Sequence, residues 1–447
     1  MRRDSFGSRF GALVALAGSA VGLGNLWRFP YLVGENGGAA FIIIYIVFVF
    51  LICLPIFISE FIVGRRSQKN AFAAFRDLSG GSGWRWVGLM TVIVPVVVTS
   101  YYSVIGGWAV EYLFKSFTFS FTAEAQSVID TMFSDFTSSP WRPLICHTAF
   151  LCVTALIVVM GIKGGIEKFS KIMMPLLFVI VMAIAVYSLT LSGAHKGVEY
   201  LFRPDFSKID AKSCAAALGQ AFFSLSLGFG TIMTYASYVD KKENIMFQST
   251  ATAVSDLMFA LIAGIAVMPA VFAFGLDPQS GPGLVFETLP YVFSQMPAGG
   301  LVAILFFIAL LVAAITSSIS MFEVGVAYLI EEKKMSRIAA CSVLLAVCWS
   351  VGALCSLSFG PLSDVRLAGM NIFDFFDNLS SNILMTLGSL LTVLFVGWRL
   401  KKTEIYDEFT NGGTISANVR IFGILWFLIR YVAPVAVAVV FLSGIIA

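Results

Sequence analysis

Charged residues are scarce in this sequence. Asp, Glu, Lys and Arg make up 12% of the 447 residues, whereas hydrophobic residues make up 58%. The charged share of a typical soluble domain is about 25%, roughly twice as large. The composition therefore excludes a water-soluble protein and predicts a polytopic membrane protein.

Motifs for metal binding and for catalysis are also missing. The sequence has two histidines, His147 and His195, and seven cysteines without a C-x-x-C spacing. A structural zinc site needs clustered Cys and His ligands, so we expect none and interpret the cysteines as buried free thiols. An enzyme would need a nucleophile–base pair or a metal cluster. We find neither, and we expect no enzymatic activity and no nucleic-acid partner.

Long apolar segments are abundant, and most have the length of a helix that crosses a bilayer, about 20 residues. The eleven segments lie near residues 10–33, 40–64, 86–117, 143–162, 167–191, 213–237, 246–275, 298–330, 337–357, 371–398 and 424–446. With the N-terminus inside, seventeen Lys and Arg lie on the cytoplasmic side and six outside, which satisfies the positive-inside rule. We therefore predict an all-α fold of about eleven transmembrane helices, with the N-terminus cytoplasmic and the C-terminus outside.

The first apolar segment is a poor continuous helix. It contains Gly18, Gly22 and Gly24 within seven residues, and Asn25 and Arg28 follow directly. Each glycine costs about 1 kcal/mol relative to alanine inside a helix. Backbone groups freed at membrane depth are tolerated only inside the protein or beside a cavity. We therefore predict a polar binding site at this break.

The sixth segment has the same feature. Gly219, Gly228 and Gly230 interrupt it, and Ser224 and Ser226 lie beside the expected break. Two glycine-interrupted helices five segments apart are typical of inverted-repeat transporters with a site between the repeats. We predict a 5+5 inverted repeat in which helices 1 and 6 are unwound at mid-membrane. The expected single domain, residues 1–447, comprises a first repeat over about 10–191, a second over about 213–398 and a last helix over about 424–446.

Polar residues on two other segments support this interpretation. Ala313, Thr316 and Ser317 have the i, i+3, i+4 spacing that places them on one helix face. One carbonyl and two hydroxyls there suit a hard cation such as sodium, although such hydroxyls can also bond back to their own helix. Asp256 lies midway through the seventh segment. An ionisable residue at that depth is a functional candidate.

Several long motifs follow one another along the chain. They are GSAVGLGNLWRFPYL, ENGGAAF, PIFISEFIVGR, the pair Tyr101 and Tyr102, QAFFSLSLGFGTIMTYASYV, AAITSSIS and FDFFDNLSSN. With these motifs in this order, the chain resembles the neurotransmitter:sodium symporters, in the branch of bacterial amino-acid transporters with the LeuT-type fold. The resemblance covers almost the whole sequence, and glycine-rich membrane helices alone would not establish it.

The resemblance implies two sodium sites and a substrate site between them. The first sodium site comprises Ala20, Asn25, Ser224 and Asp256, together with the carboxylate of the substrate. The second comprises Gly18, Val21, Ala313, Thr316 and Ser317. The implied substrate-binding residues are Ser19, Ala20, Leu23, Gly24, Val98, Tyr102, Phe223, Ser224, Ser226, Phe229, Ser317 and Met321. Without the motifs, plain helix packing would explain the aromatic residues and Met321 equally well.

The resemblance also implies gates. The outer gate is Arg28 with Asp377, and the inner gate comprises Arg3, Phe6, Ser237, Tyr238 and Glu331. Either charged pair could instead be an ordinary surface ion pair, worth about 0–1 kcal/mol. Gly165 and Pro175 bracket part of the fifth helix, where proline removes a donor. Unwinding of this part is the expected route for water to the second sodium site.

Two positions bear on the substrate and the ions. Gly22 stands where monoamine-transporting relatives have an aspartate, so we expect an L-amino acid and not a monoamine. The apolar Val98, Phe229 and Met321 indicate a neutral, hydrophobic or aromatic side chain. Asp256 stands where an asparagine is common, and chloride-dependent relatives hold chloride with residues matching Tyr45, Gln220 and Ser224. A fixed carboxylate can supply that negative charge. We therefore expect chloride-independent transport, and pH sensitivity if Asp256 takes up a proton during the empty return step.

Other functions are compatible with the same fold. An amino-acid sensor or a leaky channel can share it, since a fold alone does not determine function. A sensor typically carries an added signalling domain, which we do not expect in this chain. The resemblance to prokaryotic members implies a bacterial inner membrane. The oligomeric state is left open.

Overall fold

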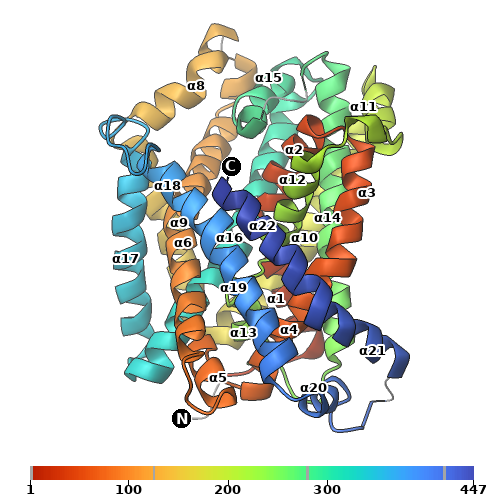
Figure 1. Cartoon of the computed structure of the whole chain (residues 1–447). Coiled ribbons are helices and arrows are strands. Elements are labelled where there is room, and N and C mark those ends of the chain that lie inside the picture. The colour runs from red at the N-terminus through yellow and green to blue at the C-terminus, as the bar shows by residue number, and fades with distance from the viewer. Residues whose placement is uncertain (1–3, 124–125, 278–280, 416–418, 447) are drawn as a thin grey trace.

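The structure is a computed structural model that describes residues 4–123, 126–277, 281–415 and 419–446. These residues form helices joined by short connections, and they contain no β-strand (Figure 1). The all-α polytopic membrane fold predicted from the sequence is confirmed.

The bundle consists of α-helices with short π-helical and 3-10 segments between some of them. The α-helices are α1 (Arg9–Ala20), α2 (Phe29–Glu35), α3 (Ala39–Phe48), α4 (Leu54–Ser67), α5 (Ala71–Leu78), α6 (Arg85–Phe117), α7 (Ser120–Ala123), α8 (Gln126–Ser138), α9 (Arg142–Val159), α10 (Lys168–Leu189), α11 (Ala194–Phe202), α12 (Ala211–Ser224), α13 (Thr231–Ala236), α14 (Ile245–Ala273), α15 (Thr288–Gln295), α16 (Gly299–Lys333), α17 (Arg337–Leu357), α18 (Ile372–Asn378), α19 (Met385–Leu394), α20 (Lys402–Phe409), α21 (Val419–Phe427) and α22 (Ala433–Ile446). The π-helical segments are η1 (Gly24–Arg28), η2 (Val49–Cys53), η3 (Ile162–Glu167), η6 (Leu379–Leu384), η7 (Phe395–Arg399) and η8 (Leu428–Val432), and the 3-10 segments are η4 (Phe206–Lys208) and η5 (Gly281–Leu284).

Nine helices in the described part of the chain are long and apolar enough to cross a membrane. A tenth span results if α1 and the segment Gly24–Glu35, which are bent by 47° at a short break, are counted as one. The expected sixth segment is present as α12 and α13, separated by residues 225–230. The count of eleven spans therefore stays a prediction.

The two interrupted segments pack against each other in the middle of the bundle. The half helix η1 contacts α12, and α1 contacts α13, so the beginning of one segment meets the end of the other. The long helices α6 and α16 pack together and supply two further walls. This antiparallel arrangement is the one that an inverted repeat would give, and it places both breaks at one location.

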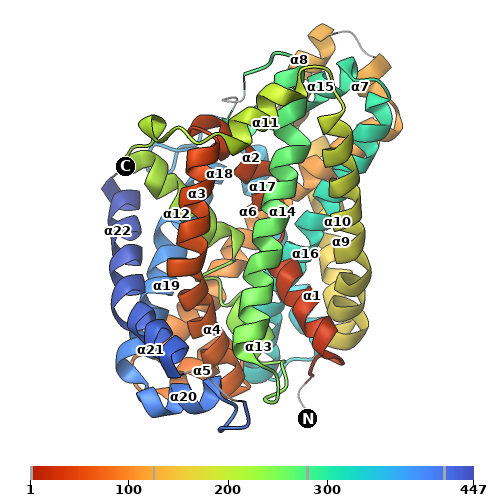
Figure 2. The same ribbon diagram turned by 90° about the vertical axis from the view of Figure 1, so that its right-hand side faces the viewer.

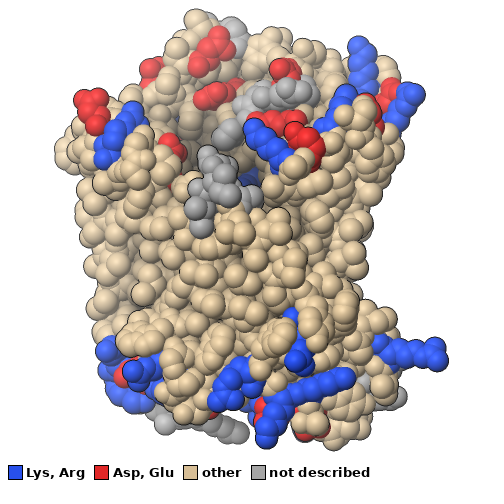
Figure 3. All heavy atoms as spheres, viewed as in Figure 1, with Lys and Arg blue, Asp and Glu red and all other residues tan. Residues whose placement is uncertain are grey.

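The side of the helix bundle exposes large apolar side chains, as expected for a surface in contact with lipid. Large apolar side chains such as Leu156, Val179 and Ile338 are about two-thirds exposed on α9, α10 and α17. The start of α1 and the end of α22 lie at opposite ends of the bundle in both views (Figures 1 and 2). Lys and Arg side chains gather at the lower end of the space-filling view, where α5 and α20 lie (Figure 3).

Candidate functional site

The break after α1 is held by side chains as well as by backbone. Val21 has extended backbone (φ −71°, ψ 104°), which ends the helix. The N–H of Gly22 donates to Asn25 Oδ1 at 3.1 Å, and the N–H of Leu23 donates to the hydroxyl of Tyr102 at 3.4 Å. Asn25 therefore satisfies a donor at the start of the second half helix, as capping residues do.

The break after α12 depends on left-handed backbone. Ser226, Gly228 and Gly230 have φ of 52°, 80° and 69°, a region that glycine enters without a steric cost. A Cβ on Gly228 would lie 2.1 Å from the carbonyl oxygen of Met385, so no larger residue fits. The N–H of Gly228 donates to Glu60 Oε1 at 2.7 Å.

A buried cavity lies between the two breaks. Its volume is about 20 Å³, little more than one water needs. The residues that line it are Ser19, Ala20, Gly22, Leu23, Gly24, Val98, Tyr102, Phe223, Ser224, Ser226, Phe229, Ser317 and Met321. The structure thus brings together all of the predicted substrate-binding residues, and adds Gly22.

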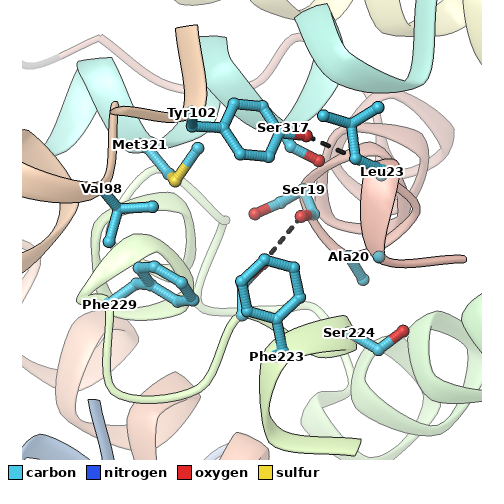
Figure 4. Close-up of a pocket in the computed structure, with 13 residues that line it drawn as sticks. Ser19, Ala20, Leu23, Val98, Tyr102, Phe223, Ser224, Phe229, Ser317 and Met321 are labelled. Carbon is cyan, nitrogen blue, oxygen red and sulfur yellow. Dashed lines mark hydrogen bonds between the residues drawn. The ribbon is translucent and has the colours of Figure 1, made fainter. Parts of the chain in front are cut away.

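The lining has a polar side and an apolar side (Figure 4). Leu23 and Ser317 lie beside the hydroxyl of Tyr102, whereas Val98, Met321 and Phe229 lie together on the other side. Phe223 meets Phe229 edge to face, with ring centroids 6.4 Å apart. These apolar side chains close the cavity, so they must move apart to admit a larger molecule.

Gly22 is tightly enclosed. A Cβ at this position would lie 2.3 Å from Ser317 Oγ and 3.4 Å from the hydroxyl of Tyr102. Real Cβ contacts essentially never fall below 3.0 Å. A carboxylate side chain at position 22 would therefore displace Ser317 and enter the cavity.

Three polar residues meet beside the cavity, and we call Asn25, Ser224 and Asp256 the Asp256 cluster. Ser224 Oγ donates to both carboxylate oxygens of Asp256, at 2.9 and 2.8 Å, and Asn25 Nδ2 donates to Asp256 Oδ1 at 2.8 Å. The hydroxyl of Tyr45 lies 3.5 Å from Asp256 Oδ2. All four side chains are buried. The carboxylate, the hydroxyl and the Asn25 amide oxygen are hard ligands that suit a sodium ion.

A second group lies on the other face of the α1 break, and we call Val21, Ala313 and Thr316 the Thr316 cluster. Thr316 Oγ1 lies 2.9 Å from the carbonyl oxygen of Ala313 and 3.4 Å from that of Val21. The Cβ of Thr316 is 3.5 Å from the position of a Cβ on Gly18. Four of the five expected second-site residues therefore converge, and the fifth, Ser317, faces Gly22. The hydroxyl also contacts its own helix, as the alternative interpretation expects.

Comparison with known proteins identifies the family. A model of the Sodium:neurotransmitter symporter family matches residues 3–128 and 129–447. The chain belongs to this family. It is 40% identical over 438 residues to the "Uncharacterized sodium-dependent transporter YhdH" of Bacillus subtilis, covering 98% of this chain and 96% of that protein. It is 36% identical over 456 residues to an "Uncharacterized sodium-dependent transporter" of Haemophilus influenzae, covering 99% and 98%.

A solved structure supports the same assignment. The crystal structure of MhsT in complex with L-phenylalanine superposes with a TM-score of 0.91 at 42% identity, covering 99% of this chain and all of that one. The protein is therefore a membrane transporter that uses sodium ions, and not an enzyme. The prediction of a bacterial-type neurotransmitter:sodium symporter with the LeuT-type fold is confirmed.

The symporter's expected outer gate is not an ion pair in this conformation. The guanidinium of Arg28 lies over the ring of Phe223, 5.0 Å from its centroid. Asp377 Oδ1 accepts a hydrogen bond from Ser381 Oγ at 3.1 Å. Both residues are described, and no ion pair joins them. A role for this pair in gating stays a prediction.

Two residues of the expected inner gate, Phe6 and Tyr238, are in contact, and the gate itself stays a prediction. The ring of Phe6 packs edge-on against the ring of Tyr238, with centroids 6.2 Å apart, and the backbone N–H of Phe6 donates to the carbonyl of Tyr238. Glu331 Oε2 accepts from the backbone N–H and the side-chain amide of Asn70, both at 2.9 Å. Ser237 is buried beside Tyr238. Arg3 lies outside the described residues.

The fifth helix of the symporter is continuous in this conformation. Gly165 lies in η3 and Pro175 lies inside α10. The unwinding is not seen here and stays a prediction. Between these two residues, Glu167 accepts hydrogen bonds from the N–H of Gly7 at 2.6 Å and from Ser8 Oγ at 3.0 Å. The segment that precedes α1 is thus tied to the stretch that is expected to unwind.

Sequence reasoning missed two buried glutamates. Glu60 supports the second break through Gly228, and Glu323 accepts hydrogen bonds from Tyr238 at 2.8 Å and from Arg337. Both side chains are fully buried. The sequence could have indicated both residues, because an acidic residue inside an apolar segment is a functional candidate by default. This rule was applied to Asp256 but not to Glu60 and Glu323.

Proposed function

We propose that this protein is a symporter that couples sodium entry to the uptake of neutral, hydrophobic or aromatic L-amino acids by alternating access. The observation that carries the proposal is the cavity between the two helix breaks. Its lining combines backbone groups of the two breaks and hydroxyls on one side with apolar side chains on the other.

The polar side suits the amino and carboxyl groups of an amino acid. A carboxylate would accept from the N–H groups of Leu23 and Gly24, at the positive end of a half helix, and from Tyr102. In the structure, the N–H of Leu23 donates to the hydroxyl of Tyr102, so both groups already lie where the carboxylate would bind. An ammonium group would meet the carbonyls near Ala20 and Ser224. Gly22 favours such a substrate, because an aspartate there would compete for the same space.

The apolar side suits a hydrophobic or aromatic side chain. Val98, Phe229 and Met321 form this wall (Figure 4), and they offer no charged partner. The structurally similar MhsT was solved with L-phenylalanine. Discrimination among such substrates is worth only about 1–3 kcal/mol per methylene, so a set of related amino acids is the expected specificity.

Two sodium ions are the proposed coupling ions. The Asp256 cluster and Ala20 would hold the first, together with the substrate carboxylate. The Thr316 cluster, Gly18 and Ser317 would hold the second. Each sodium ion carried inward gains about 2.3 kcal/mol per 100 mV of membrane potential. With a zwitterionic substrate, transport is then electrogenic.

Chloride is not needed in this scheme. The hydroxyls of Tyr45 and Ser224 both lie against Asp256 Oδ2, at 3.5 and 2.8 Å. These two residues match positions that hold chloride in chloride-dependent relatives. The carboxylate of Asp256 therefore supplies the negative charge beside the first sodium ion.

Sodium release depends on the fifth helix in our proposal. The position of a Cβ on Gly18 is 3.2 Å from Met174 Sδ, so the residue before Pro175 packs directly behind the second sodium site. Unwinding of this stretch would admit water from the cytoplasm. We expect Pro175→Ala to slow intracellular sodium release and the transport rate. An unaltered rate for this variant would contradict the unwinding step.

The proposed location is a bacterial inner membrane, with the N-terminus in the cytoplasm and the C-terminus outside. The distribution of Lys and Arg supports this orientation (Figure 3), because basic residues favour the cytoplasmic side. A cysteine-accessibility experiment with a membrane-impermeant reagent on a Ser5→Cys variant would test it.

The decisive experiment is uptake of radiolabelled amino acids into proteoliposomes. Uptake driven by an inward sodium gradient is compared with uptake when potassium replaces sodium. Gly22→Asp, whose added carboxylate would occupy the cavity, is the control variant. We expect sodium-dependent accumulation of hydrophobic and aromatic amino acids, and none with the control. Sodium-dependent binding without accumulation would indicate a sensor. No response to any amino acid would contradict the proposed substrate class.

A further inference from the structure

Two π-helical segments pack together at one end of the last two long helices. They are η7, which follows α19, and η8, which precedes α22, and α19 and α22 lie side by side (Figures 1 and 2). The contact is close at Gly397, where a Cβ would lie 3.1 Å from the Cα of Arg430. The indole N–H of Trp398 donates to the carbonyl of Arg430 at 3.0 Å. The backbone of Arg430 is therefore firmly placed.

The guanidinium of Arg430 is surrounded by aromatic rings. It lies 4.6 Å from the ring centroid of Trp398, 5.6 Å from that of Tyr431 and 5.8 Å from that of Trp426. Cation–π contacts of this kind hold the guanidinium by its flat faces. They leave the N–H groups at its edge free to bind oxygen atoms in the same plane.

The described parts of the chain supply no acceptor for these N–H groups. Among those residues, the side chain of Arg430 makes no ion pair and no hydrogen bond, and its Nε is buried without a partner. The arginines nearby differ. Arg399 donates to the carbonyl of Ser79 at 3.1 Å, and Arg66 pairs with Glu404 at 3.7 Å. The two Nη groups of Arg430 also have no acceptor among the described residues, and unlike Nε they are not fully buried. An external anion is therefore the natural partner of Arg430.

The position of Arg430 identifies the source of that anion. Trp398 is 58% exposed and Tyr431 is 47% exposed, so these two rings form the outer wall of the cage and face the surrounding lipid. Trp398 directly precedes Arg399, and the exposed Lys401 and Lys402 follow. Aromatic rings with adjacent basic residues mark the headgroup level of a membrane. At that level the abundant anion is the phosphate of a phospholipid.

We propose that Arg430, with Trp398, Trp426 and Tyr431, forms a site for the phosphate of an anionic phospholipid in the cytoplasmic leaflet. The aromatic rings orient the guanidinium, which binds two phosphate oxygens, an arrangement that arginine makes with high geometric specificity. Lys401 and Lys402 add positive charge that favours an anionic lipid over a zwitterionic one. The assignment of the leaflet rests on the orientation proposed above, whereas the site itself is independent of the transported substrate.

Lipid retention on the purified transporter tests this site. The protein in detergent is mixed with phosphatidylglycerol or phosphatidylcholine at equal concentration, and bound lipid is counted by native mass spectrometry. We expect preferential retention of phosphatidylglycerol, lowered at least about tenfold in Arg430→Gln and less in Arg430→Lys. Arg420→Gln, which removes an exposed arginine of α21, should retain lipid like the original protein.

Further experiments distinguish a lipid site from a site for a soluble anion and from a misfolded variant. Trp398→Leu keeps the charge of Arg430 but removes one of the aromatic rings around it, so it should also lower lipid retention. This variant tests the site even if circular dichroism shows that Arg430→Gln does not fold. An excess of inorganic phosphate should not displace the lipid, and displacement would indicate a site for a soluble anion. Equal retention of the two lipids, or retention unchanged in both Arg430→Gln and Trp398→Leu, would overturn the proposal. Loss of retention without loss of uptake leaves the proposed transport function intact.

Discussion

The Asp256 cluster and the Thr316 cluster lie on either side of the break in the first segment, yet they are built differently. The Asp256 cluster joins η1, α12 and α14 through side chains and contains a carboxylate. The Thr316 cluster joins the end of α1 to α16 through one hydroxyl and two carbonyls. One therefore carries a formal negative charge at membrane depth, and the other is neutral.

This difference assigns the two clusters different tasks. A fixed charge attracts a cation strongly at low local dielectric. Ser224 of the same cluster lines the cavity, where a substrate carboxylate would complete the ligand set. A neutral group of dipoles binds a cation more weakly and can release it once water enters. We therefore expect the Asp256 cluster to couple substrate to sodium, and the Thr316 cluster to control the release step.

The largest expected effect is that of Asp256→Ala. It removes the only carboxylate of the cluster, and with it the acceptor of the Ser224 hydroxyl and the shortest hydrogen bond of the Asn25 amide. We expect sodium-dependent substrate binding to fall by about 100-fold or more, since loss of one partner from a buried charged network costs about 3–5 kcal/mol. Scintillation proximity binding measures this. Asp364→Asn, an exposed acid, is the control, and near-normal binding by Asp256→Ala would show that the charge is not a ligand.

Gly22→Ala tests the space between the two clusters. The added Cβ would lie 2.3 Å from Ser317 Oγ, so either the break or Ser317 must shift. We expect uptake to fall about fivefold to 150-fold, as overpacking costs about 1–3 kcal/mol. Gly219→Ala is the matched control, because a Cβ there meets nothing within 4 Å. If both variants lost uptake equally, the loss would not report on the cavity.

Thr316→Ala tests the neutral cluster. It removes one hydroxyl while leaving the carbonyls in place, and the loss of one neutral ligand is worth about 1 kcal/mol. We expect the sodium concentration for half-maximal uptake to rise about fivefold to tenfold, with less change in substrate binding. Thr316→Ser should restore the original value. A larger effect than that of Asp256→Ala would reverse our ranking of the two clusters.

Glu167→Gln tests the connection of the Thr316 cluster to the cytoplasmic side. Glu167 accepts from Gly7 and Ser8 through two different oxygens, and Gln offers one acceptor oxygen, so the change disrupts one of these hydrogen bonds and removes the ion pair with Lys171 at 2.6 Å. We expect apparent substrate affinity to fall about threefold, because the inward-open state becomes more populated. Glu199→Gln, an exposed glutamate of α11, is the control. Unchanged affinity and unchanged accessibility of α1 would show that Glu167 has no such role.

The smallest expected effect is that of chloride removal. Uptake in gluconate medium should equal uptake in chloride medium, if Asp256 supplies the negative charge as we propose. In Asp256→Asn, whatever uptake remains should be stimulated by chloride. A strict chloride requirement in the unaltered protein would contradict the proposed role of the carboxylate.

The sequence predicted most of the residues that line the cavity, but not the buried residues that hold the surrounding helices in place. The residues around Gly22 and Phe229 lie in motifs that are typical of the family, so their positions could be transferred from the resemblance. Glu60 lies in one of the family motifs and Glu323 lies in an apolar segment, but the resemblance was used to assign neither of them a role. Their roles depend on partners more than 80 residues away in the chain, which no local pattern indicates. Likewise, the rings around Arg430 come from two helices that only the fold brings together.

The membrane class, the helical fold, the two breaks and the family all follow from the amino-acid sequence, because hydropathy and glycine placement act locally and the motifs are long. The pairing of groups within one conformation follows from helix packing instead. Arg28 lies over Phe223 instead of meeting Asp377, and Pro175 lies within an unbroken helix. Such pairings depend on how helices distant in sequence pack, and a transporter passes through several packings with the same sequence.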